Sequence, residues 1–278
     1  MRIVNVSDVS KKVEEALITA NKILPDDIYT AIKKAIEEET QELAKDVLEK
    51  IVENADIAKE EFIPMCQDTG MVVCFLEVGY DVKFDGDVYD AINEGVRSAY
   101  IKGYLRKSVA DPITRKNTND NTPAVIHTKL VPGDKVRLVV APKGAGSENM
   151  SLVKMLTPAD GVEGIKKLVL DTIFKAGGRP CPPIILGLGI GGNLEKSAMI
   201  AKEALLRELN DINPDPELAE LEKELLKEIN ELGVGPMGFG GKTTAIGVKV
   251  AKYPTHIAAL PVAINIQCHA ARHMEIII

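Results

Sequence analysis

The stretches PIILGLGI at residues 183–190 and AALPVAINIQ at residues 258–267 decide the fold class. Both are short, apolar and rich in β-branched residues, which is typical of buried strands. Similar runs occur at residues 71–78 (MVVCFLEV), 123–131 (PAVIHTKLV), 135–142 (KVRLVVAP) and 244–251 (TAIGVKVA). Because these runs do not alternate regularly with helices, the sequence predicts an α+β fold with a mixed or antiparallel central sheet.

Helical patterns flank the predicted strands. Residues 8–60 carry apolar side chains at helical spacing with charged residues between them. Two further charged helices are expected at about residues 194–209 and 216–232. We therefore expect one domain over 1–278, in which residues 1–60 form a helical N-terminal layer and residues 61–278 form the mixed α/β part.

Composition limits the possible functions. The 278 residues carry a net charge of −7, and nucleic-acid binding is not expected because it requires a basic surface. The N-terminus lacks a signal-type apolar segment, and no apolar run is long enough to span a membrane. Four cysteines are too few for a secreted disulfide scaffold, so we expect a reducing compartment, the cytoplasm.

Three cysteines lie in distinctive contexts: Cys66 in MCQDTG, Cys181 in RPCPPI and Cys268 in IQCHAARH. None forms a CxxC pair, which argues against a zinc ribbon and favours a metal centre assembled by the fold. Iron–sulfur clusters use thiolate ligands, and a cluster held by only three cysteines leaves one iron open as a Lewis acid. Cys74 lies inside an apolar run and is expected to be a core residue.

The chain ends on Ile276-Ile277-Ile278, ten residues after Cys268. An apolar terminus so near a metal ligand suggests that another protein chain covers it.

Two glycine-rich segments resemble nucleotide sites. Residues 187–192 satisfy GxGxxG, but the acidic residue that should end the next strand about 20 positions on is missing. GFGGKTT at residues 238–244 lacks P-loop spacing because Pro236 stands where a glycine is needed. Neither segment matches its motif completely, but a dinucleotide-binding oxidoreductase remains an alternative. Both segments could offer backbone N–H groups to an anion.

Seven motifs in order identify a family resemblance: CQDTG, LRKSV, NDNTPAVIH, KGAGSEN, RPCPPIILGLGIGG, GFGGKTTAIGV and THIAALPVAINIQCHAARH. Over nearly the whole chain they resemble the alpha subunit of class I fumarate hydratase and L-tartrate dehydratase. The resemblance implies a [4Fe–4S] cluster with one open iron, held by Cys66, Cys181 and Cys268. It makes Asp68 the catalytic acidic residue, able to pass a proton to or from a hydroxyl on that iron.

The resemblance also implies substrate contacts. Gln67 would donate a hydrogen bond to a substrate carboxylate, and Arg106 would bind a carboxylate as an ion pair. Gly144 and Gly146 belong to a loop whose backbone N–H groups approach the substrate. His256 matches a histidine near the substrate or cluster, with a catalytic role.

Single-chain members of this family continue into a second domain that this chain lacks. The resemblance therefore implies a beta subunit that supplies the remaining substrate-binding residues and the catalytic base, in a dimer of alpha–beta pairs. The expected reaction is reversible conversion of (S)-malate to fumarate and water, with L-tartrate dehydration as the alternative. A non-catalytic iron–sulfur or zinc protein is a further alternative.

Overall fold

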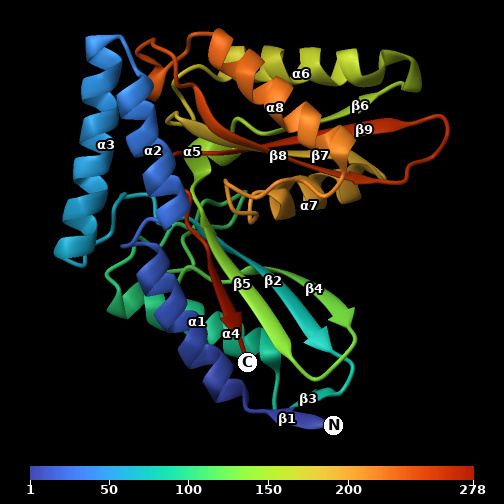
Figure 1. Cartoon of the computed structure of the whole chain (residues 1–278). Helices are drawn as coiled ribbons and strands as arrows, with labels where there is room; N and C mark the ends of the chain where they lie inside the picture. The colour runs from blue at the N-terminus through green and yellow to red at the C-terminus, as the bar shows by residue number, and fades with distance from the viewer. The chain divides into compact units, whose positions relative to one another are not determined.

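The computed structural model describes all 278 residues, and the chain divides into two compact units. Unit 1 comprises Met1–Pro25, Asn54–Ala145 and Arg272–Ile278; unit 2 comprises Asp26–Glu53 and Gly146–Ala271. Each unit has its own sheet with helices packed on it (Figure 1). Both sheets mix parallel and antiparallel pairs, which confirms the α+β class predicted from the sequence.

Unit 1 is built on a four-stranded sheet with the order β10-β5-β2-β4. The inner strand β2 (Met71–Gly79) pairs antiparallel with β5 (Val136–Lys143) and parallel with β4 (Val125–Val131). β10 (Met274–Ile277) pairs antiparallel with β5. The strands thus bring the end of the chain beside segments more than a hundred residues earlier.

Two helices cover this sheet, α1 (Val6–Ala20) and α4 (Val88–Lys102). Their first turns are capped by the side chains of Asn5 and Asp87, which accept backbone N–H groups as N-caps do. Gly95 of α4 allows close packing, because a Cβ there would lie 2.5 Å from a carbonyl oxygen of α1. A short parallel pair, β1 (Arg2–Val4) with β3 (Val82–Phe84), completes the unit.

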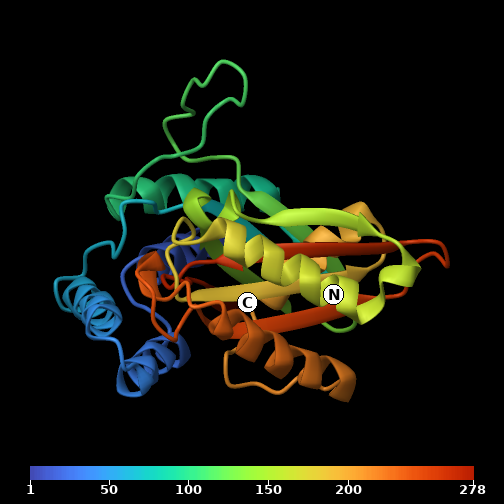
Figure 2. The same ribbon diagram turned by 90° about the horizontal axis from the view of Figure 1, so that it is seen from above.

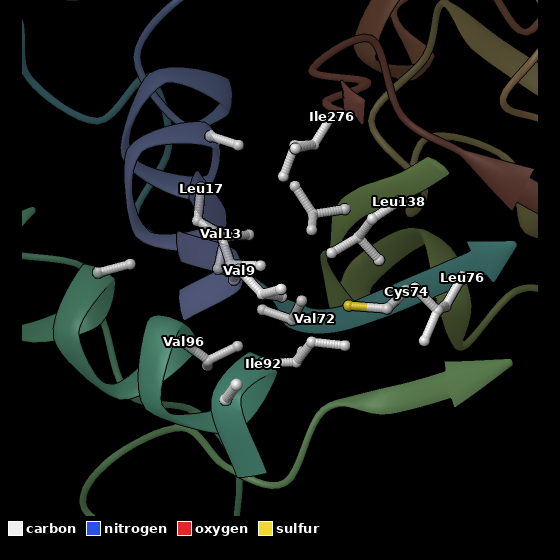
Figure 3. Close-up of a cluster of buried hydrophobic side chains, with 14 of the residues drawn as sticks. Val9, Val13, Leu17, Val72, Cys74, Leu76, Ile92, Val96, Leu138 and Ile276 are labelled. Atoms are coloured by element: carbon white, nitrogen blue, oxygen red, sulfur yellow. The ribbon is translucent and has the colours of Figure 1, made fainter. Parts of the chain in front are cut away.

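The core of unit 1 lies between the helices and the sheet. Figure 3 shows side chains of α1, α4, β2, β5 and β10 converging there. Cys74 points into this cluster and is fully buried, which confirms that it is a core residue. Burial raises the pKa of its thiol to about 12, so it stays protonated at neutral pH.

The C-terminal tail pairs within its own chain. β10 pairs with β5, and Ile276 is buried in the core of unit 1, while the coverage of the tail by another chain stays a prediction. The last residue continues this pairing, since Ile278 and Val136 exchange backbone hydrogen bonds. An apolar tail can therefore be an edge strand as well as an interface.

Unit 2 is built on a second four-stranded sheet with the order β6-β9-β7-β8. β7 (Ile184–Gly191) pairs parallel with β8 (Ala245–Tyr253) and antiparallel with β9 (Leu260–Gln267). β6 (Leu152–Leu156) pairs antiparallel with β9.

Helices cover both faces of the second sheet. α7 (Leu194–Ala204) packs on one face, and α6 (Gly161–Ala176) and α8 (Pro216–Glu231) lie on the other (Figure 1). Unit 2 also contains α2 (Asp26–Glu38), the first part of α3 (Glu42–Glu60), α5 (Ala145–Glu148) from its second residue on, and the helical turns η1 (Pro158–Asp160) and η2 (Pro236–Gly238). None of the helices combines the length and apolar content that a membrane crossing requires.

The predicted helices at residues 8–60 are present as α1, α2 and α3, and the helices expected near 194 and 216 are α7 and α8. The division between the units falls within α3, with α1 in unit 1 and α2 in unit 2, and the single domain with a helical N-terminal layer over residues 1–60 stays a prediction. Helices α4 and α6 were not anticipated. Half of the buried residues of α4 are Ala or Gly, whose small side chains give a weak periodic signal.

Candidate functional site

The loop between α3 and β2 carries Cys66, Gln67 and Asp68 in unit 1. Asp68 is held by two backbone donors: the Gly70 N–H reaches its Oδ1 at 3.1 Å, and the Ala145 N–H reaches its Oδ2 at 2.8 Å. Each carboxylate oxygen can accept more than one hydrogen bond, so Asp68 keeps acceptor capacity for a further partner. The structure thus fixes this carboxylate two residues from a cysteine.

Buried side chains fix the backbone of the same loop. The hydroxyl of Tyr100, on α4, shares its one proton between the carbonyl oxygens of Thr69 at 2.6 Å and Gly70 at 2.9 Å. The Asn121 Nδ2 also donates to the Gly70 carbonyl, at 3.1 Å. Burial raises the pKa of Tyr100 above its ordinary value, so its hydroxyl remains a donor at neutral pH.

Arg106 is tied to this loop through its backbone, because the Thr69 hydroxyl donates to the Arg106 carbonyl at 2.9 Å. Arg106 lies in the long connection between α4 and β4, green at the top of Figure 2. Its guanidinium and the side-chain amide of Gln67 are exposed and take part in no hydrogen bond or ion pair of the chain. Both are therefore free to bind a carboxylate from solution.

Gly144 lies directly against Asp68. A Cβ at this position would be 3.0 Å from Asp68 Oδ2 and 3.7 Å from Nη2 of Arg272. Its absence leaves room for the Ala145 N–H to reach the carboxylate. Gly146, by contrast, has space around it, since the nearest atom to an added Cβ is the Arg179 carbonyl oxygen at 3.9 Å.

Arg272 was not among the residues chosen from the sequence. It is 3% exposed, and its Nη2 donates to the Asp68 carbonyl at 2.8 Å while its Nη1 donates to Asn21 Oδ1 at 3.1 Å. The motif IQCHAARH contains Arg272, but nothing in the sequence distinguishes a buried arginine from a surface one. Tyr100 and Asn121 were missed for the same reason.

Cys181 and Cys268 lie on neighbouring loops of unit 2. The residue after Cys268 contacts Cys181: the His269 N–H donates to the Cys181 carbonyl at 3.4 Å, and Nδ1 of His269 lies 2.9 Å from the same oxygen. Cys66 belongs to unit 1. None of the three cysteines forms a disulfide and each is partly exposed, and no group of three or more His, Cys, Asp or Glu is preassembled for a metal ion.

The chemistry of the three cysteines fits an iron–sulfur cluster, since thiolates are the usual ligands of such clusters. The two thiols of unit 2 lie on loops that already touch. Three cysteine ligands on accessible loops are compatible with a cluster that keeps one iron open.

His256 is far from Cys268 along the same sheet. The two residues precede and follow β9, so the whole strand, roughly 25 Å of backbone, separates them. His256 lines a largely apolar groove of about 570 Å³ between α6, α8 and the β8–β9 connection, and its Nδ1 accepts the Ala258 N–H at 3.2 Å. The structure therefore does not bring His256 to the cysteines of unit 2.

The GxGxxG segment serves packing rather than nucleotide binding. Gly187 and Gly189 lie within β7, where a Cβ would be 2.0 Å and 2.1 Å from carbonyl oxygens of Ala201 and Ser197 in α7. In a dinucleotide site these glycines would instead form the turn before the helix. The segment lets a helix approach a strand closely, which removes the main support for the oxidoreductase alternative.

The GFGGKTT segment is hydrogen-bonded to a carboxylate of the same chain. The Glu39 carboxylate accepts the Lys242 N–H at 2.7 Å, as well as the N–H groups of Thr40 and Gln41. Burial alone would raise the pKa of Glu39, but these donors hold it below its ordinary value. The Glu39 carboxylate thus already occupies the Lys242 N–H group, which a bound phosphate would need.

Comparison with known proteins gives consistent results. The sequence profile of the family described as fumarate hydratase (fumerase) matches residues 10–277. A protein of Methanocaldococcus jannaschii, which carries the provisional name L(+)-tartrate dehydratase subunit alpha, is 44% identical over 271 residues, covering 95% of each chain. L(+)-tartrate dehydratase subunit alpha of Escherichia coli O157:H7 is 30% identical over 92% of this chain and 86% of its own length. The corresponding subunit of E. coli K12 is 29% identical over the same shares.

Proposed function

Because this chain belongs to the class I fumarate hydratase (fumerase) family, we propose that it is the alpha subunit of an iron–sulfur hydro-lyase for a C4 hydroxydicarboxylate. The family and the named relatives indicate a hydro-lyase, and relatives named as alpha subunits imply a beta-type partner chain. The names of these relatives favour L(+)-tartrate as substrate over (S)-malate, the substrate expected from the sequence.

The observation that carries this proposal is the arrangement around Asp68. Its carboxylate is fixed by the Gly70 and Ala145 N–H groups, Gly144 leaves space beside it, and Gln67 and Arg106 are exposed without partners. A fixed carboxylate beside free carboxylate-binding groups suits a substrate that carries both a hydroxyl and carboxylates.

Cys66, Cys181 and Cys268 would hold a [4Fe–4S] cluster, which when bound would supply Lewis acidity toward a substrate oxygen. Arg106 and Gln67 bind the substrate carboxylates and thereby hold the substrate in the orientation that the reaction requires. Asp68 holds or moves a proton at Oδ2, the oxygen beside Gly144. The beta subunit supplies the base for the carbon-bound proton, and a dimer of alpha–beta pairs is the assembly we propose.

The proposal is tested with the chain co-produced with its beta-type partner and reconstituted anaerobically with iron and sulfide. Dehydration of L(+)-tartrate and hydration of fumarate are assayed side by side, together with iron per chain. Cys181→Ser should lose iron and both activities, whereas the matched variant Cys74→Ser should retain iron because Cys74 lies in the core. Full activity in Cys181→Ser, or no turnover of either substrate by the unaltered pair, would refute the proposal.

A further inference from the structure

Arg272 is a buried cation that pairs with no carboxylate. Only 3% of the residue is exposed, its two hydrogen bonds go to the Asn21 side-chain oxygen and the Asp68 carbonyl, and its buried Nε has no partner. Burying a charge without an ion pair is costly, so the residue is a poor choice for stability alone. We therefore looked for its role in the two groups to which it is hydrogen-bonded.

The two hydrogen bonds of Arg272 join Asp68 to the end of α1. Asn21 is fully buried, its Nδ2 donates to the Leu17 carbonyl at 2.9 Å, and its own carbonyl accepts the Met65 N–H at 3.0 Å. The guanidinium therefore bridges a rigid helix end and the carbonyl of Asp68. Arg272 holds the backbone carbonyl of Asp68, while the Gly70 and Ala145 N–H groups hold its two carboxylate oxygens.

We propose that Arg272 is a positioning residue of the hydro-lyase site, which sets the direction of the Asp68 carboxylate by holding the Asp68 carbonyl against Asn21. This inference rests on the proposed function. Arg272 acts through Asp68 rather than on the substrate, because it is almost completely buried. A guanidinium suits the task since its planar fork reaches two acceptors at a fixed separation, which a lysine ammonium does not.

The role makes a specific kinetic prediction. A misplaced catalytic group lowers the rate of the chemical step, and a displacement of about 1 Å can cost on the order of 100-fold. Loss of Arg272 should therefore lower kcat by about 10- to 100-fold, while KM, which reports on Gln67 and Arg106, changes less than about threefold. A residue that only stabilised the fold would lower the amount of active enzyme and thus the apparent kcat as well, so kcat is calculated per folded, iron-loaded pair, for which only a positioning role lowers it.

The test uses the reconstituted alpha–beta pair with three variants: Arg272→Ala, Arg272→Lys and the control Arg137→Met. Arg137 is a surface arginine of the same unit, paired with Glu77 and Glu275, and exposed pairs contribute little. We measure kcat and KM, and then the recovery of kcat in Arg272→Ala with added guanidinium ion. Amide hydrogen exchange of residues 66–70 in the full chain gives a readout that needs neither turnover nor cluster.

The expected result is a lower kcat in both Arg272 variants, partial recovery of Arg272→Ala by guanidinium, and faster exchange in the loop than in Arg137→Met. Unchanged kcat, or a raised KM with unchanged kcat, overturns the inference. If Arg272→Ala does not fold, Arg272→Lys decides: wild-type kcat and loop exchange in that variant overturn it as well. An unaltered pair that turns over neither tartrate, malate nor fumarate refutes the proposed function instead.

Discussion

Two glycines of one loop allow a matched test of how Asp68 is placed. In Gly144→Ala the new Cβ would lie 3.0 Å from Asp68 Oδ2 and 3.3 Å from its Cγ, whereas ordinary contacts begin near 3.4 Å. The carboxylate must therefore move by a few tenths of an ångström. In Gly146→Ala the nearest atom is 3.9 Å away, so nothing has to move.

The displacement should change the free energy of unfolding little but lower kcat considerably. Overpacking of this kind costs about 1 kcal/mol, at the lower end of the usual range. Since a displacement of about 1 Å can cost 100-fold in rate, a shift of a few tenths should lower kcat about three- to tenfold. Gly146→Ala should stay within about twofold of the unaltered protein, because neither the backbone nor Asp68 is disturbed.

Initial rates of tartrate dehydration and fumarate hydration by the reconstituted pair measure both effects, and urea unfolding of the alpha chain measures the stability change. Iron per chain serves as the control for cluster loading. Equal kcat in the two variants would refute the steric reasoning. A large loss in Gly146→Ala alone would show that the N–H of that residue, and not the space beside Asp68, limits the rate.

Tyr100→Phe removes the hydroxyl that the Thr69 and Gly70 carbonyls share, so it should lower the free energy of unfolding by about 1–2 kcal/mol in urea titrations. Because the pKa of Tyr100 is raised in the fold, the unaltered chain should lose stability as pH rises above about 10, and this loss should be smaller in the Phe variant. Burial alone would raise the pKa of Asp120, but Thr122 and Arg97 lower it to about 2, so its contribution should be present above about pH 4 and lost as pH falls toward 2. Acid unfolding curves of Arg97→Met should show a weaker pH dependence in that window. Gly187→Ala should destabilise unit 2 by about 3 kcal/mol or more in thermal unfolding, since its Cβ would lie 2.0 Å from a backbone oxygen of α7; a neutral effect would contradict the packing role.

Local patterns in the sequence predicted most elements of the fold. The β-branched runs became β2, β4, β5, β7, β8 and β9, and the 8–60 periodicity became three helices. The pairing of β10 with β5 was not predictable in the same way. Its partners are separated by more than a hundred residues, and four residues of strand give almost no periodic signal.

The candidate site was predictable where motifs carry it and not where tertiary packing does. Asp68 and Gly144 were found from CQDTG and KGAG, and the structure brings them into contact. Arg272 was missed because its partner Asp68 lies 204 residues earlier. The sequence pattern also does not predict that an arginine is buried. Gly187 is the opposite case. It belongs to a segment that matches the GxGxxG motif, but it lies inside β7 and allows close packing of α7.

The reactivity of Cys74 toward thiol reagents reports on the opening of the unit 1 core. Thiol reagents react with the thiolate, and a fully buried thiol with a raised pKa offers neither access nor charge. In the metal-free chain the other three cysteines are partly exposed, so alkylation should modify three thiols quickly and the fourth only when the core opens. The rate of that last alkylation therefore measures how often unit 1 opens under native conditions, without any added label.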